Sequence, residues 1–310
     1  MDYGMNSSVK RRPLPSKKVL ILPGGGVFGV IISGFLKGYD PLGSIGGSIN
    51  IDAVGGTSVG SILACMYGAG LSFGTVHDKL CEGIPDIFRT SWFNRNGVWG
   101  PRHDAAVLER WLERYLMVPF GVLKPAIFCT SIELASSKIK VFDNFAEHDD
   151  LRLPAWQVAR ASSAAPTYFS PFDCKGTAYV DGGLFENIPV VSTCCGIRSK
   201  MDIALDQQDV FVIGTGIRGG GKYKPCDMAG WGLLSWSQPI VEMLTSSNEM
   251  SSSFIGRQLQ LRGLRIFNPI TLEDDWAMNQ PGIVPKLLDL VAQNQSAFNK
   301  EFSAWLSSKA

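Results

Sequence analysis

The sequence predicts an α/β fold with a parallel sheet. Two short apolar segments, 19–22 and 49–54, are each followed by a glycine-rich turn and then by an apolar segment long enough for a helix. A third apolar segment, 209–213, also ends at glycine. Strands that alternate with helices pair in parallel, and the turns at their carboxyl ends open at one edge of the sheet. We therefore expect the first two glycine turns to lie side by side.

The composition is that of a folded globular protein. Hydrophobic residues make up 45% of the 310 residues and charged residues 18%, and no linker divides the chain. The net charge of +1 creates no global field for nucleic acid. No apolar run approaches the length of a transmembrane helix. Seven cysteines without metal-ligand spacing indicate free thiols, so we expect a cytoplasmic protein. We predict a flexible basic arm over 1–18 and one domain over 19–310.

The other elements follow from apolar spacing and turn residues. The segment 103–115 has apolar residues at helical spacing, and Pro154 suits the first turn of a helix over 153–165. A polar turn joins two strand-like segments, 126–133 and 138–143. Further helices are predicted for 30–39, 231–261 and 282–306, and further strands for 178–180 and 262–269. A loop rich in aromatic residues is predicted for 91–99.

The second glycine turn carries a candidate nucleophile. Ser58 stands between Gly56 and Gly60, with a predicted strand before it and a helix after it. This is the nucleophile-elbow pattern, in which small neighbours permit a tight turn that exposes the serine. The helix that begins there directs free N–H groups towards developing negative charge. The alternative is a serine that merely caps the helix.

The first glycine turn has two interpretations. Gly24, Gly26 and Gly29 satisfy a dinucleotide-binding fingerprint, with Asp52 near the second strand as the acidic residue. The same glycines can instead offer backbone N–H groups to an oxyanion. An acyl-transfer site needs both glycine turns, one for the nucleophile and one for the oxyanion, whereas a dinucleotide site does not need the Ser58 turn. We therefore favour acyl transfer.

A serine nucleophile needs a base. The chain has three histidines, His77, His103 and His148, and Asp104 followed by His148 fits the order of a common serine hydrolase triad. None of the histidines has a diagnostic neighbour. The alternative is a dyad in which Asp181, at the end of a predicted strand, takes the serine proton directly. Asp181 can also be an ordinary turn residue that bonds to its own backbone.

Four separated motifs follow one another along the chain: Gly24 to Gly29, Gly56 to Gly60, Ala161 to Phe169 and Asp181 to Gly183. Together they resemble the patatin-like phospholipases, in that family's order. Two later segments, 212–216 and 265–269, are also similar to recurring parts of the family. The resemblance extends over nearly the whole chain, from about 19 to about 306.

The resemblance implies a three-layer α/β/α fold with a central, mainly parallel sheet and helices on both faces. It implies a calcium-independent serine hydrolase of lipid acyl esters, without metal or cofactor, that acts on phospholipids at a membrane surface during transient peripheral association. Ser58 matches the nucleophile and Asp181 the base. The oxyanion hole is matched by the N–H groups of Gly24, Gly25 and Gly26. The motifs are supported by Gly29, Gly56, Gly60, Gly182 and Gly183.

One residue departs from the family pattern. The family usually carries arginine or lysine in the first motif, where this chain has Phe28. That basic residue is thought to support the oxyanion loop or to meet anionic head groups. The departure motivates an alternative function, a patatin-fold effector or lipid-binding protein with little basal hydrolysis that needs an activator. The sequence leaves open whether an activator or a homo-oligomer is involved.

Overall fold

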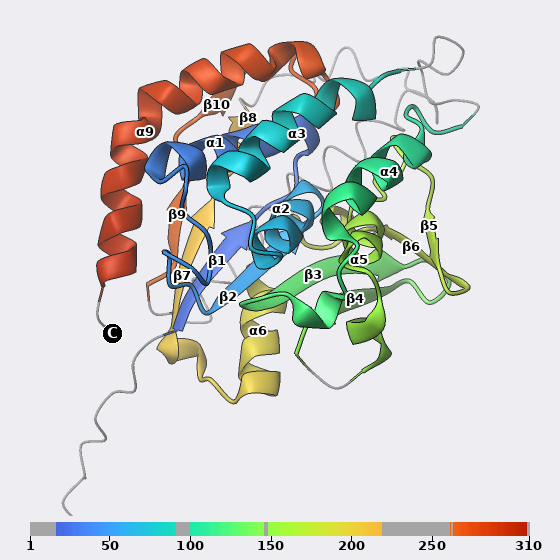
Figure 1. The fold of residues 1–310 in the computed structure, drawn as a ribbon, viewed down its shortest axis with the longest axis horizontal. Helices are drawn as coiled ribbons and strands as arrows, with labels where there is room; N and C mark the ends of the chain where they lie inside the picture. The colour runs from blue at the N-terminus through green and yellow to red at the C-terminus, as the bar shows by residue number, and fades with distance from the viewer. Residues whose placement is uncertain (1–16, 91–99, 146–147, 219–260, 262, 309–310) are drawn as a thin grey trace, which may run out of the picture.

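The computed structural model describes residues 17–90, 100–145, 148–218, 261 and 263–308. Within them, an eight-stranded sheet has the order β5-β6-β3-β2-β1-β7-β9, and β4 pairs with β3 (Figure 1). The parallel strands are β1 (Lys17–Leu22), β2 (Ala53–Thr57), β3 (Ala126–Glu133), β7 (Gln208–Ile213) and β9 (Arg265–Phe267). The antiparallel strands are β4 (Lys138–Asp143), β5 (Phe172–Cys174) and β6 (Thr177–Asp181).

Helices cover both faces of this sheet (Figure 1). Side chains alternate along β1, so that Leu20 and Leu22 join one apolar cluster while Val19 and Ile21 join another. The first cluster contains residues of α1, α2, α3, α4, α5 and α9, and the second contains residues of α6. The helices are α1 (Gly29–Tyr39), α2 (Val59–Gly68), α3 (Phe73–Ile87), α4 (Ala105–Leu116), α5 (Ala155–Ser162), α6 (Val190–Met201) and α9 (Val284–Ser307).

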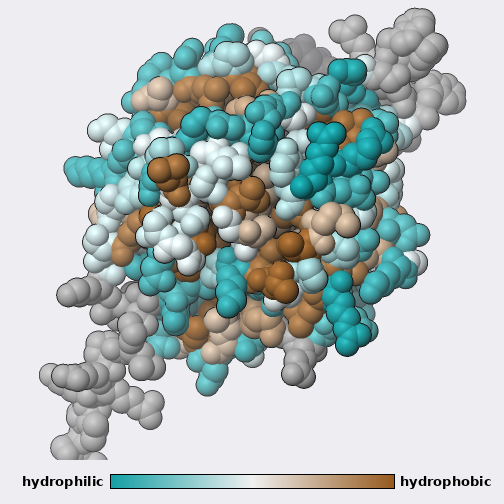
Figure 2. Space-filling model, in the orientation of Figure 1, coloured by the Kyte–Doolittle hydropathy of each residue, from teal (hydrophilic) through white to brown (hydrophobic). Residues whose placement is uncertain are grey.

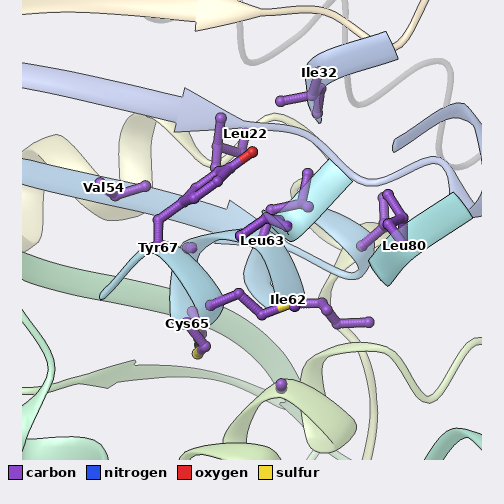
Figure 3. Packing of buried hydrophobic residues seen from close by; sticks show 14 of the residues in the cluster. Leu22, Ile32, Val54, Ile62, Leu63, Cys65, Tyr67 and Leu80 are labelled. Carbon is purple, nitrogen blue, oxygen red and sulfur yellow. Dashed lines mark hydrogen bonds between the residues drawn. The ribbon is translucent and has the colours of Figure 1, made fainter. Parts of the chain in front are cut away.

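The larger cluster fixes α2 against the strands. Figure 3 shows Leu22 of β1 in one group with Tyr67 and Leu63 of α2, with Val54 of β2 on one side of this group and Leu80 of α3 on the other. Tyr67 of α2 is fully buried in the same cluster. On the face of the molecule seen in Figure 2, apolar side chains lie in patches between polar ones.

Helices thus cover both faces of a sheet in which most strands are parallel. The predicted three-layer fold with a mainly parallel sheet is confirmed.

Two strand boundaries differ from the prediction. β1 begins at Lys17, because Lys17 and Lys18 pair with β7. β2 spans Ala53–Thr57 and not 49–54, because it pairs on one side with β1 and on the other with β3, and this double ladder holds its two glycines in extended conformation. The turn is thereby reduced to Ser58 alone.

The rest of the predicted elements are found near their expected positions, where the structure describes them. The predicted helix over 231–261, except for its last residue, and the aromatic loop over 91–99 lie outside the described residues. Because residues 1–16 also lie outside them, the basic arm over those residues and the single domain stay predictions. Lys17 and Lys18, the last two residues of the predicted arm, belong to β1 instead. Within the described part of the chain, none of the helices combines the length and the apolar character needed to cross a bilayer.

Candidate active site

Ser58 occupies a strained turn between β2 and α2. Its φ of 54° and ψ of −123° lie in a region that residues with a side chain seldom adopt. Two contacts hold it there: its N–H donates to Ser162 Oγ at 3.0 Å, and its carbonyl accepts from Ser61 Oγ at 2.7 Å. The Ser58 side chain makes no capping hydrogen bond to α2, so the helix-cap alternative is wrong. The half-buried hydroxyl lines a cavity instead.

The glycines around Ser58 permit backbone contacts that a Cβ would prevent. A Cβ on Gly60 would overlap the carbonyl of Leu22 in β1, and one on Gly29 would overlap the side chain of Val59. A Cβ on Gly56 would strike the backbone of Gly60. The start of α2 can therefore lie directly against the end of β1, which brings the two glycine turns together.

Asp181 ends β6 beside Ser58. It is 5% exposed, and its Oδ1 accepts the Gly183 N–H at 2.7 Å. Burial raises the pKa of Asp181 to about 6, although a side-chain hydrogen bond from Ser58, the Gly183 N–H and the charge of Arg160 each lower it. The turn contact expected of an Asp-Gly pair is thus present, and the Ser58 side chain also lowers the pKa of the same carboxylate.

The N–H groups of the first glycine turn are not all available. Gly24 donates its N–H to the carbonyl of Asn187 at 3.1 Å, which corrects its expected place among the oxyanion donors. In the described part of the chain, no acceptor is bonded to the N–H of Gly25 or Gly26. Both glycines have positive φ, 154° and 57°, and line the same cavity as Ser58. These two can serve as the oxyanion donors.

A cavity of about 240 Å³ opens at Ser58 and Asp181. Its remaining wall is largely apolar and is built mainly by the helices in front of the sheet. Phe28 belongs to this wall and is 4% exposed. Apolar lining residues include Val59, Ile62, Leu80, Ile84, Ile87, Phe88, Leu108, Trp111, Tyr168, Phe169, Leu184, Ile217, Leu272 and Met278. Such a wall suits a hydrocarbon chain next to two reactive polar groups.

The histidines lie elsewhere. None of the three is among the cavity-lining residues, and Asp104 caps α4 by accepting the N–H of Ala106 at 2.9 Å. Their side-chain partners include Ser33 and Cys81 for His77, Asn279 for His103, and Asp143 and Asp150 for His148. The triad alternative is therefore wrong, because each histidine is bonded to another element and Asp181 contacts the serine without one.

The dinucleotide interpretation fails on the position of Asp52. This residue precedes β2, and its carboxylate accepts from the N–H of Lys18 at 2.8 Å and from the Lys17 ammonium at 2.9 Å. It therefore lies at the amino end of the strands, whereas the glycine turns open at the carboxyl end. A ribose bound at the glycines needs its acidic partner at the carboxyl end.

Several supporting residues were not predicted in these roles. Ser162 Oγ accepts the Ser58 N–H and so supports the strained turn. Thr215, in a segment similar to the family, donates its hydroxyl to the carbonyl of Gly24 at 3.0 Å. Arg160 is fully buried and bonded to Glu109 at 3.0 Å. Arg160 directly precedes the motif Ala161 to Phe169, and this position is the sequence signal that could have indicated its effect on the pKa of Asp181.

Comparison with known proteins agrees with the geometry. The family model for patatin-like phospholipase matches residues 20–193. A cGAMP-activated phospholipase of Escherichia coli is 28% identical over 69% of this chain and 65% of its own length. The 85/88 kDa calcium-independent phospholipase A2 of Rattus norvegicus is 27% identical over 62% of this chain and 25% of its own length. The crystal structure of VipD from Legionella pneumophila has a TM-score of 0.51 at 12% identity, over 93% of this chain and 67% of that one.

The first of these relatives is matched over slightly less than two thirds of its length, and the rat enzyme over a quarter. The family model nevertheless matches more than half of this chain, and its range contains both glycine turns and Asp181. The likeness to VipD supports the fold. The chain belongs to the patatin-like phospholipase family.

Proposed function

We propose that the chain hydrolyses fatty acyl esters of membrane phospholipids, with Ser58 as nucleophile and Asp181 as base. One observation carries this proposal: Ser58 and the buried carboxylate of Asp181, whose pKa the Ser58 side chain lowers, line the same largely apolar cavity. A carboxylate of ordinary pKa is a weak base. Burial supports Asp181 in the role, because it raises the pKa to about 6 and so makes the carboxylate a stronger base.

The reaction proceeds in two steps. Asp181 takes the hydroxyl proton while Ser58 Oγ forms a bond to the ester carbon, and the electron pair of the C=O bond moves to oxygen. The N–H groups of Gly25 and Gly26 stabilise this oxyanion. When the C=O bond re-forms, the ester C–O bond breaks, and the leaving alkoxide takes the proton from Asp181. Water then attacks the acyl-serine with Asp181 as base, which releases the fatty acid and restores Ser58.

The cavity wall supports an acyl chain as the part of the substrate that is bound most deeply. Phe28, in the position where the family usually has a basic residue, adds apolar surface there and no charge. A head group would therefore be recognised outside the cavity. Phe185 and Ile217 are 54% and 53% exposed; Ile217 lines the cavity, and Phe185 follows the lining residue Leu184. Transient contact of this rim with a bilayer would let a lipid enter.

Two finer features are proposed from the relatives. Calcium independence is supported by the name of the rat relative, and by a proposed mechanism that uses only protein groups. Control by an activator is supported by two relatives named cGAMP-activated phospholipase, from Escherichia coli and Pseudomonas aeruginosa. An effector with a low basal rate therefore remains the alternative form of the same function.

The proposed function is tested with purified protein and mixed phospholipid vesicles, with and without calcium. Released fatty acid and lysolipid are measured by mass spectrometry. We expect calcium-independent release that is lost in Ser58→Ala and in Asp181→Asn and kept in Ser199→Ala, a control on the exposed end of α6. Release that survives in Ser58→Ala would refute the dyad. A silent wild type that labels at Ser58 with a fluorophosphonate would favour the activator-dependent form.

A further inference from the structure

Trp111 and Ile87 lie where two cavities of the molecule adjoin. The second cavity, of about 670 Å³, is bordered by α3 and α4 and the residues next to them. Among the described residues, the linings of the two cavities share Trp111 and Ile87 alone, and Ser58 and Asp181 belong only to the lining of the first. Trp111 and Ile87 therefore form the partition between the active-site cavity and the second one.

The Trp111 indole is held in the partition by contacts from both helices. Trp111 is 7% exposed and Ile87 is 5% exposed. Gly83 lets the indole lie directly against α3, because a Cβ at this glycine would overlap Trp111 Nε1. From α4, the ring of Tyr115 packs edge-on against the indole, with 5.3 Å between the ring centroids. Because neighbours on two sides fix the indole, it has little freedom to move out of the way of a ligand.

The two cavities differ in chemistry. On the side of the active site, Trp111 adjoins apolar lining residues of α3 and α4 such as Leu80, Ile84 and Leu108. A hydrocarbon chain gains free energy against these side chains. The second cavity is lined by charged residues of both signs, which are Glu82, Asp86, Arg89, Asp104, Arg110 and Arg114. The apolar surface available to an acyl chain therefore ends at the partition.

We propose that the Trp111 indole, with Ile87 beside it, sets the longest acyl chain that the enzyme hydrolyses efficiently. This inference rests on the proposed function and makes Trp111 a residue that determines substrate specificity. When the ester carbonyl is at Ser58, the acyl chain extends into the cavity, and each methylene that reaches apolar surface adds to binding. Once the chain reaches the indole, further methylenes find no space and must fold back or stay in water.

Chain-length profiles test the partition. Saturated p-nitrophenyl esters from butanoate to octadecanoate are presented in mixed detergent micelles to the wild type and to Trp111→Ala. In the wild type, kcat/KM should rise by on the order of fourfold per methylene and then stop rising at one length, the cut-off. In Trp111→Ala the rise should continue beyond this cut-off, so that the next two methylenes gain on the order of tenfold relative to the wild type.

Two further variants control for effects on folding. Trp111→Phe keeps an aromatic ring in the partition and should move the cut-off less than Trp111→Ala. Trp156→Ala removes a half-buried tryptophan outside the cavity lining and should keep the wild-type profile. The ratio of kcat/KM between two esters is measured on one preparation, so a fraction of protein that fails to fold does not alter it.

Binding of free fatty acids separates this inference from the proposed function. Fatty acids of the same lengths displace a fluorescent fatty acid from Ser58→Ala and from the double variant that also carries Trp111→Ala. We expect the length at which affinity stops rising to be greater in the double variant. A cut-off that stays in place when the indole is removed, in either series, would overturn the inference. Ester hydrolysis that survives in Ser58→Ala would instead refute the proposed function, while a cut-off in fatty-acid binding that moves with the indole would still support the partition.

Discussion

Replacement of Asp181 by asparagine should abolish hydrolysis and at the same time stabilise the folded protein at neutral pH. Burial raises the pKa of this carboxyl from 3.8 to about 6, so the folded state carries the charged form at a free-energy cost. At about 1.4 kcal/mol per pKa unit, the cost at neutral pH is about 3 kcal/mol. Asparagine has no charge, and its amide oxygen can still accept the Gly183 N–H.

The sign of the shift fixes the pH dependence. Below pH 3.8 the carboxyl is protonated in the folded and the unfolded chain, and the wild type incurs no cost from this residue. The cost appears as the pH rises from 3.8 and is complete above about 6. Between pH 4 and pH 7.5, the free energy of unfolding of Asp181→Asn should therefore gain about 2 kcal/mol relative to that of the wild type.

Urea unfolding of both proteins at the two pH values measures this difference, and comparison with the wild type cancels the titration of all other groups. Ser58→Ala is the matched control. It keeps the carboxylate and loses a hydrogen bond that lowers the pKa of Asp181, so its stability should decline with pH at least as steeply as that of the wild type. A difference between wild type and Asp181→Asn that stays constant with pH would refute the reasoning.

Three further predictions concern the site and its surroundings. The kcat/KM of the wild type should fall as the pH drops below about 6, because Asp181 becomes protonated. Arg160→Met should move the midpoint of this pH profile to higher pH, because it removes a charge that lowers the pKa of Asp181. An unmoved midpoint would contradict this prediction. Gly60→Ala should destabilise the fold by at least about 2 kcal/mol in urea unfolding, because the Cβ overlaps the backbone of β1, and wild-type stability would contradict the overlap. Phe185→Asp should weaken vesicle binding in flotation assays, whereas Leu42→Asp, at another exposed apolar residue, should not. Equal effects of the two substitutions would argue against a membrane-facing rim at the cavity.

The sequence could predict the parts of the site that depend on local geometry. A serine between glycines after an apolar strand requires a tight turn, and Ser58 has the strained backbone that such a turn imposes. The alternation of strands and helices predicts parallel pairing, and parallel pairing brings the two glycine turns to one edge. Asp181 at a strand end followed by glycines could be predicted as a candidate for the same reason.

The sequence could not predict contacts between distant segments. Nothing near Gly24 indicates that its N–H is bonded to Asn187, because the partner lies in another loop. The end of β2 was misplaced because glycine usually breaks a strand, and pairing on both sides overrides that preference here. Asp52 stood at a plausible distance along the chain for a ribose contact, and only the register of β1 and β2 places it at the opposite end of the strands.

A dyad without histidine depends on one physical property, the burial of its carboxylate. The same desolvation that costs stability in the charged form makes Asp181 a stronger base, by about two pKa units. The contacts from Ser58, Gly183 and Arg160 keep the shift from becoming larger. If they were absent, the pKa would be higher and less of the carboxyl would be ionised to accept the serine proton. The site therefore requires a carboxylate whose burial raises its pKa and whose hydrogen bonds and neighbouring positive charge keep it ionised.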